Sequence, residues 1–105
     1  MAKIVAIVSD LMLASRVSES LKAAGHEVSV GPTLPDPLEA EAIVCDLDTA
    51  DLDAVVATSL PALGFYSHVD IETKQRAEAA GIQKVVPRSR MSRELPTLIS
   101  KLLEG

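Results

Sequence analysis

Five short apolar runs divide the chain at fairly regular intervals, and polar or turn-forming residues follow each of them. The runs cover residues 3–9, 27–30, 42–46, 62–67 and 83–86. Most are rich in β-branched residues, and runs of this length and composition are typical of strands buried on both faces of a parallel sheet. The pattern therefore predicts five strands.

The segments between several of these runs show helical periodicity. Ala14, Val17, Leu21 and Ala24 recur at helical spacing within residues 11–24, and Gly25 follows in the usual C-terminal capping position. Further helices are expected at residues 51–59, at residues 70–80 and in the C-terminal segment that begins at Ser92. Residues 31–37 contain three prolines and predict a loop. Residues 37–41 leave room for at most one helical turn.

The predicted helix starts depend on capping residues. Asp70 is the expected N-cap of the helix at residues 70–80, and Ser92 of the last helix, which places Pro96 in a first turn, where proline is tolerated. The alternation of strands and helices predicts an α/β fold, a three-layer doubly wound five-stranded parallel sheet. With five strands, the flavodoxin-like order 2-1-3-4-5 is the expected one.

Composition narrows the class of protein. A chain of 105 residues is expected to form a single domain over residues 1–105. The net charge of −5 argues against general binding to nucleic acid or to anionic membranes. Cys45 is the only cysteine, and it is expected to act as a small buried apolar residue. Without a secretory signal or a membrane-spanning run, the expected location is cytoplasmic.

Three polar residues follow predicted strands and mark one edge of the sheet. Asp10 comes after the first run, Asp46 ends the third, and Arg88 follows the fifth. Ligands of open parallel sheets bind outside the carboxyl ends of the strands. Two carboxylates and a guanidinium are therefore expected to converge there, with Arg88 within ion-pair distance of one acid.

These positions resemble those of bacterial response-regulator receiver domains. Ser9-Asp10 occupies the place of that family's acidic pair, Asp46 that of the phosphorylated aspartate, and Ser67 that of the hydroxyl residue. Arg88 stands where the family has a lysine. The resemblance implies a cytoplasmic two-component signalling module with Asp46 as candidate phosphoacceptor.

The same comparison reveals departures from the family pattern. One acid is missing at Ser9, and Pro87 comes one residue early, before Arg88 rather than after it. His68 replaces the small residue that normally admits the phosphate at the edge of the site. These departures suggest a degenerate receiver, or pseudo-receiver, which is not efficiently phosphorylated. It is expected to act without enzymatic activity, as a stand-alone module in contact with other proteins.

Two other interpretations stay open. In the first, Asp46 is phosphorylated, and weak Mg²⁺ binding uses Asp10, Asp46 and the backbone carbonyl of Asp48. In the second, the chain is a small enzyme or small-molecule-binding domain that uses the acidic edge. The degenerate interpretation requires no cofactor, because a permanent ion pair between Arg88 and Asp46 or Asp10 would neutralise the site.

Charge is distributed unevenly and suggests an interaction surface. Residues 1–53 hold ten acids and three bases, whereas residues 54–105 hold five acids and seven bases. The predicted partner surface, for a protein partner or a homodimer, comprises the helix at 70–80, the strand at 83–86 and the last helix. Its bases are Lys74, Arg76, Lys84, Arg90 and Arg93.

Overall fold

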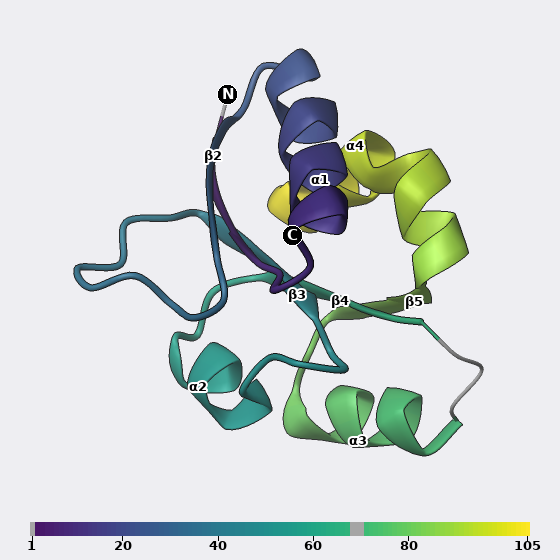
Figure 1. Ribbon diagram of the computed structural model, residues 1–105. Helices are drawn as coiled ribbons and strands as arrows, with labels where there is room; N and C mark the ends of the chain where they lie inside the picture. The colour runs from purple at the N-terminus through teal and green to yellow at the C-terminus, as the bar shows by residue number, and fades with distance from the viewer. Residues whose placement is uncertain (1, 68–70) are drawn as a thin grey trace.

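The computed structural model describes residues 2–67 and 71–105 as an α/β fold built on one parallel sheet (Figure 1). The strands are β1 (Lys3–Ile7), β2 (Glu27–Gly31), β3 (Ala42–Asp46), β4 (Ala62–Tyr66) and β5 (Lys84–Pro87). The helices are α1 (Leu11–Ala23), α2 (Leu52–Ala57), α3 (Ile71–Ala80) and α4 (Arg88–Glu104). The strands lie in the order β2-β1-β3-β4-β5, and every pair is parallel, so the predicted fold class and strand order are confirmed.

Helices cover both faces of the sheet and form three layers. Figure 1 shows α1 and α4 on one face and α2 and α3 on the other. The first face buries a continuous apolar cluster that includes Val17, Phe65 and Leu95, and the second buries a smaller one that includes Ile43 and Val55. The central strands β3 and β4 are buried along their whole length. The apolar runs therefore behave as the sequence pattern predicts for strands covered on both sides.

The connection between β2 and β3 contains no helix. Residues 32–41 form an irregular segment, as their prolines predict, and we call it the connecting segment. Leu34, Leu38 and Ala40 pack against the cluster on the α2–α3 face. This face is consequently covered beside β2 by a loop rather than by a helix.

The last helix begins five residues earlier than the predicted N-cap at Ser92 implies. Pro87, with φ −66° and ψ 151°, is its N-cap, and Arg88 is already helical. The predicted start at Ser92 is therefore wrong. Met91, only 1% exposed, packs in the same core as Leu95 one turn later, and this burial favours a helix that already includes residue 91. Strand β5 thus leads directly into α4.

Pro96 lies inside α4 rather than in its first turn. A proline has no N–H, so it cannot make the backbone hydrogen bond to the residue four positions earlier, and an interior proline normally destabilises a helix. Here Leu95, Leu98 and Ile99 are all buried around it. Packing of this apolar stripe outweighs the preference of proline for a helix start.

In the ranges 2–67 and 71–105, no helix has the length and apolar character needed to cross a lipid bilayer.

Candidate functional site

Asp46 is the central residue of the candidate site. It ends β3, the middle strand of the sheet, and only 6% of it is exposed. Its Oδ1 accepts a hydrogen bond of 2.9 Å from the backbone N–H of Asp48. Within residues 2–67 and 71–105, Oδ2 of Asp46 accepts no hydrogen bond. Every fully buried side-chain oxygen in this part of the chain has a hydrogen-bond partner, so an oxygen without one is not fully buried. Oδ2 is therefore the carboxylate oxygen that keeps access to solvent.

The surroundings of Asp46 disfavour its charged form. Burial is the largest cause and raises the pKa of the carboxyl above its ordinary value of 3.8. The hydrogen bond from Asp48 lowers this pKa and the Asp48 charge raises it. The more weakly acting charges are Arg88, which lowers the pKa, and Asp10, which raises it. The charges of Asp48, Arg88 and Asp10 therefore all reach Asp46, and the net effect of its surroundings is a raised pKa.

Asp10 has a second role as the N-cap of α1. Its Oδ1 accepts hydrogen bonds from the backbone N–H groups of Met12 at 2.9 Å and Leu13 at 3.1 Å. These bonds satisfy two of the N–H groups that a helix leaves free at its start. Asp10 is exposed, and its negative charge reaches Asp46 through space. Its place between β1 and α1 thus allows Asp10 both to lie at the acidic edge and to cap the helix.

Asp48 and Ser67 meet through a contact that the sequence did not predict. The backbone N–H of Ser67 donates to Oδ2 of Asp48 at 3.1 Å, which joins the turn after β3 to the end of β4. We expected only the backbone carbonyl of Asp48 and the hydroxyl of Ser67 to matter. The contact joins residues 19 positions apart in the sequence, so no local signal could have indicated it; the Asp46-Leu47-Asp48 spacing indicates only the local bond from Asp48 N–H to Asp46.

Arg88 is the first residue of α4 and is half-buried. The expected ion pair with Asp10 or Asp46 is wrong, because the single ion pair within 4.0 Å in the described part of the chain joins Arg90 Nε to Glu94 Oε2 at 3.5 Å. Because α4 starts at Arg88, this side chain is attached to a helix rather than to the extended end of β5, as the sequence analysis assumed. Its charge still acts on Asp46, but only from beyond contact distance.

Two of the predicted positions cannot be compared with the structure. His68, expected at the edge of the site, and Asp70, expected as a helix N-cap, lie outside the described residues.

The carboxylates at this edge fit a magnesium ion only if water supplies most of its ligands. Across residues 2–67 and 71–105, no three His, Cys, Asp or Glu side chains are grouped so as to hold a metal. Mg²⁺ is, however, often bound by one or two carboxylates together with water. Asp46, through its accessible Oδ2, and Asp10 are the side chains that would hold it, and the ion would supply charge for phosphoryl oxygens.

Cys45 lies next to Asp46 but belongs to the core. It is fully buried, and burial together with the Asp46 charge raises the pKa of its thiol to about 12. The thiol therefore stays protonated at neutral pH and is a poor nucleophile. Its predicted role as a small buried apolar residue is confirmed.

Gly64 supports the site from the neighbouring strand. A Cβ atom added at Gly64 would lie 2.7 Å from Cδ2 of Leu47, the residue between Asp46 and Asp48. Leu47 thus packs directly against Gly64 of β4, in a space that a Cβ atom could enter only if the Leu47 side chain moved. A glycine in the middle of an apolar strand often marks such a close approach, and this signal was available in the sequence.

Comparison with known proteins relates this geometry to a known fold. No protein-family profile and no curated protein matches the sequence. Among solved structures, a CheY-like response regulator receiver domain protein from Methanospirillum hungatei superposes with a TM-score of 0.86 at 14% identity, covering 99% of this chain and 94% of that one. The BeF3-activated DrrB receiver domain has a TM-score of 0.82 at 20% identity, covering 100% and 99%.

A larger protein also contains this fold. NtrX from Brucella abortus in complex with ADP matches with a TM-score of 0.80 at 19% identity over 98% of this chain, which spans only 26% of NtrX. The identities are low, and the agreement concerns the course of the backbone. The strand order, the central aspartate at the end of β3 and these superpositions together lead to one conclusion: this chain has the fold of response-regulator receiver domains.

Proposed function

We propose that this protein is a receiver-like signalling module that acts through protein contacts, without turning over a substrate, and that Asp46 is not efficiently phosphorylated. The observation that carries the proposal is the state of Asp46. It occupies the position at the end of β3 that resembles a phosphoacceptor, yet burial and neighbouring acids raise its pKa. The charged form is disfavoured at this position, and among the described residues no three acidic, His or Cys side chains are grouped to hold the metal ion that would offset this cost.

The remaining residues support the same conclusion. Aspartyl phosphorylation needs a nucleophilic carboxylate, a divalent metal and a cation near the phosphoryl oxygens. Ser9 stands where the resemblance calls for a second acid, so one metal ligand is missing. Oδ1 of Asp10 already accepts two backbone hydrogen bonds as the N-cap of α1. Arg88 makes no direct contact with Asp46, so it does not hold a phosphoryl-binding position in advance.

Intact-mass measurement after incubation with a small phosphodonor and Mg²⁺ tests the proposal. We expect only a minor fraction of the chain to gain one phosphoryl group. The matched variant Asp46→Asn keeps the side-chain shape but has no carboxylate. A stoichiometric gain that disappears in Asp46→Asn would contradict the proposal, whereas a gain that persists in the variant would show labelling at another residue.

A specific observation favours a second candidate, a phosphorylatable receiver with weak Mg²⁺ binding. Oδ2 of Asp46 is accessible, and Arg88 is not locked in an ion pair with it. Arg88 is therefore free to turn toward a phosphoryl group, which guanidinium binds well. The DrrB receiver domain is described as activated by BeF3, so the same compound with Mg²⁺ is a suitable probe here. Shifts of the Asp46 and Arg88 NMR signals on its addition would favour this second candidate.

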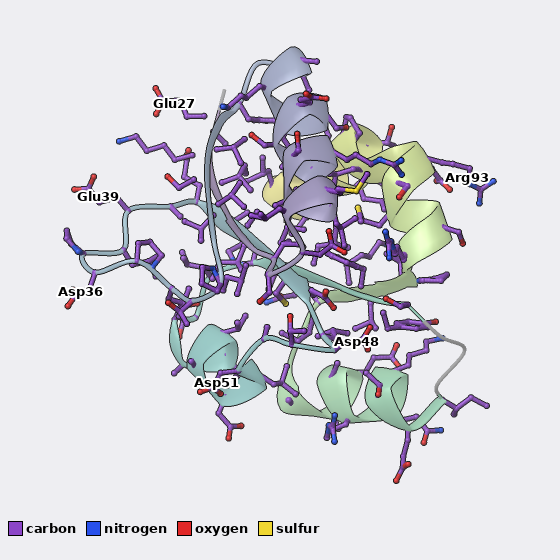
Figure 2. All side chains as sticks on the ribbon, in the orientation of Figure 1. Glu27, Asp36, Glu39, Asp48, Asp51 and Arg93 are labelled. Carbon is purple, nitrogen blue, oxygen red and sulfur yellow. The ribbon has the colours of Figure 1, made fainter. Side chains whose placement is uncertain are left out.

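We further propose that partners bind the surface formed by α3, β5 and α4, which we call the basic face. Its bases are Lys74, Arg76, Lys84, Arg90 and Arg93. Except for half-buried Lys84 and Arg90, these side chains are exposed, and Arg93 projects outward from α4 in Figure 2. Within the described residues, only Arg90 is paired with an acid. A surface of this charge fits an acidic partner, and the contact is expected to weaken with salt.

Charge reversal tests the basic face. We expect Arg90→Glu/Arg93→Glu to reduce at least about tenfold the binding of proteins retained by the immobilised wild-type chain at low salt, or its self-association measured by sedimentation. Lys22→Glu on α1 is the control, since it removes the same kind of charge from an exposed residue elsewhere. Equal loss in both variants, or none in either, would show that binding does not use this face.

A further inference from the structure

The outer edge of β2 carries backbone groups with no partner in the sheet. β2 pairs only with β1. The N–H of Glu27 donates to Ala2, and the carbonyl of Gly31 accepts from Val8. Since alternate residues of a strand face the same neighbour, the N–H and C=O groups of Val28 and Val30 point away from β1. No turn, loop or side-chain hydrogen bond reaches them from residues 2–67 or 71–105.

A groove adjoins this edge on the face that lacks a helix. It has a volume of about 400 Å³ and lies between the sheet and the connecting segment. Its lining includes Lys3 and Val5 of β1, Glu27 and Ser29 of β2, and Pro35 and Glu39. The groove exists because a proline-rich loop, rather than a helix, joins β2 to β3.

The two faces of β2 have different chemistry. Val28 packs with the cluster on the α1–α4 face, and Val30, two residues on, points the same way and is 40% exposed. Glu27 and Ser29 alternate with them and line the groove on the other face. A strand added beside β2 would therefore meet apolar side chains on one face and a carboxylate on the other.

Acidic residues dominate the rim of this region. Figure 2 shows Glu27, Asp36 and Glu39 on the same side of the molecule, opposite Arg93. Glu41, exposed just before β3, adds a fourth carboxylate, and Lys3 is the base among them. None of these acids forms an ion pair with a described residue. The rim thus has the charge to attract a basic segment.

We propose that the edge of β2, together with the groove, binds an extended segment of a partner protein as a sixth strand, and that this segment alternates apolar and basic residues. Main-chain hydrogen bonds to Val28 and Val30 supply affinity, and the alternate side chains supply selectivity. The occupant is not a second copy, because symmetric pairing of two β2 strands would bring both acidic rims together. The proposal concerns the sheet edge opposite β5 and does not rest on the function proposed for Asp46.

A synthetic peptide provides the probe. We expect a capped peptide of alternating valine and lysine, about eight residues long, to shift the amide NMR signals of Val28 and Val30 and to slow their hydrogen exchange. Binding should weaken as salt is added. A valine–glutamate peptide of the same length should bind at least about tenfold more weakly. Equal binding of the two peptides, or shifts that avoid β2, would overturn the proposal.

Variants of the chain test the two contributions separately. Val30→Pro removes one outward N–H at a position where an edge strand tolerates proline, and Val30→Thr keeps this N–H and the branched shape. Glu27→Lys/Glu39→Lys reverses the rim charge, and Glu78→Lys on α3 is its control. We expect at least about tenfold weaker binding only in Val30→Pro and in the rim variant.

The outcomes remain decisive if a variant misfolds. Should Val30→Pro fail to give a cooperative melting curve, a peptide that is N-methylated on its β2-facing amides replaces it, and it should bind wild-type protein at least about tenfold more weakly. Binding that survives both the methylated peptide and the rim reversal would overturn the proposal. So would a wild-type dimer, measured by sedimentation, that disappears in Val30→Pro.

Discussion

Replacing Gly64 with alanine is expected to lower the free energy of unfolding by about 2 kcal/mol, because the new methyl group would overlap the Leu47 side chain. The added Cβ would lie 2.7 Å from Cδ2 and 2.9 Å from Cδ1 and Cγ of Leu47. β4 is buried between two neighbouring strands, so its backbone has little room to move. Thermal and urea unfolding would measure the loss, which corresponds to a melting temperature roughly 10 °C lower.

A double-mutant cycle isolates this contact. Leu47→Ala alone should destabilise the half-buried site by about 1 to 2 kcal/mol. In the Leu47→Ala background the Gly64→Ala change should be nearly neutral, since the overlapping atoms are gone and alanine suits a strand interior better than glycine. If Gly64→Ala destabilises equally in both backgrounds, the close approach of Leu47 is not the reason for glycine at this position.

The sheet could be predicted because its signals are local and repeated. Each of the runs around Val5, Val44 and Phe65 combines apolar residues with a following turn. Continuous apolar runs of this kind are typical of strands in a parallel sheet that is covered on both faces. The strand order was predicted as the usual one for a five-stranded doubly wound sheet, and the structure confirms it. The start of α4 could not be predicted, because the burial of Met91 against other elements decides it, whereas the local preference of Pro96 indicates a different start.

The candidate site was predictable in its position but not in its contacts. The predicted fold was enough to place Asp10 and Asp46 at one edge of the sheet. The effect of the Asp10 charge on the pKa of Asp46 agrees with this placement. The ion pair of Arg88 was wrong because side-chain distances depend on where α4 begins. The contact between Asp48 and Ser67 depends on a turn geometry that the types of residue allow but do not specify.

The uneven charge of the sequence also corresponds to a spatial separation. The acidic first half contributes β2, the connecting segment and the turn after β3, whereas the basic second half contributes α3, β5 and α4. Because β2 and β5 are the two outer strands, the acidic rim and the basic face lie at opposite ends of the sheet. Partners of opposite charge would therefore contact different edges, and Asp46 on the central strand lies between them.

Asp46→Asn is expected to raise the free energy of unfolding at pH 7 by about 1 kcal/mol, as changes at strained functional positions often do. The pKa of Asp46 is raised in the folded state, chiefly by burial, so the folded chain binds a proton more tightly than the unfolded chain. Stability from this group is complete below its unfolded pKa of about 3.8 and is lost as pH rises through the folded pKa. Asparagine avoids this loss and can still accept the hydrogen bond from Asp48.

The pH dependence of this gain distinguishes burial of a charge from a general effect of the substitution. We expect wild-type and Asp46→Asn to have nearly equal stability at about pH 3, and the variant to gain progressively as pH increases toward 7. Asp51→Asn is the matched control, because it removes the same charge from an exposed N-cap of α2 that asparagine replaces well. A gain that is the same at every pH, or one that Asp51→Asn shares, would mean that ionised Asp46 does not destabilise the fold. Ionisation of Asp46 would then be no obstacle to its use as a nucleophile, and the phosphorylatable receiver would become the better description.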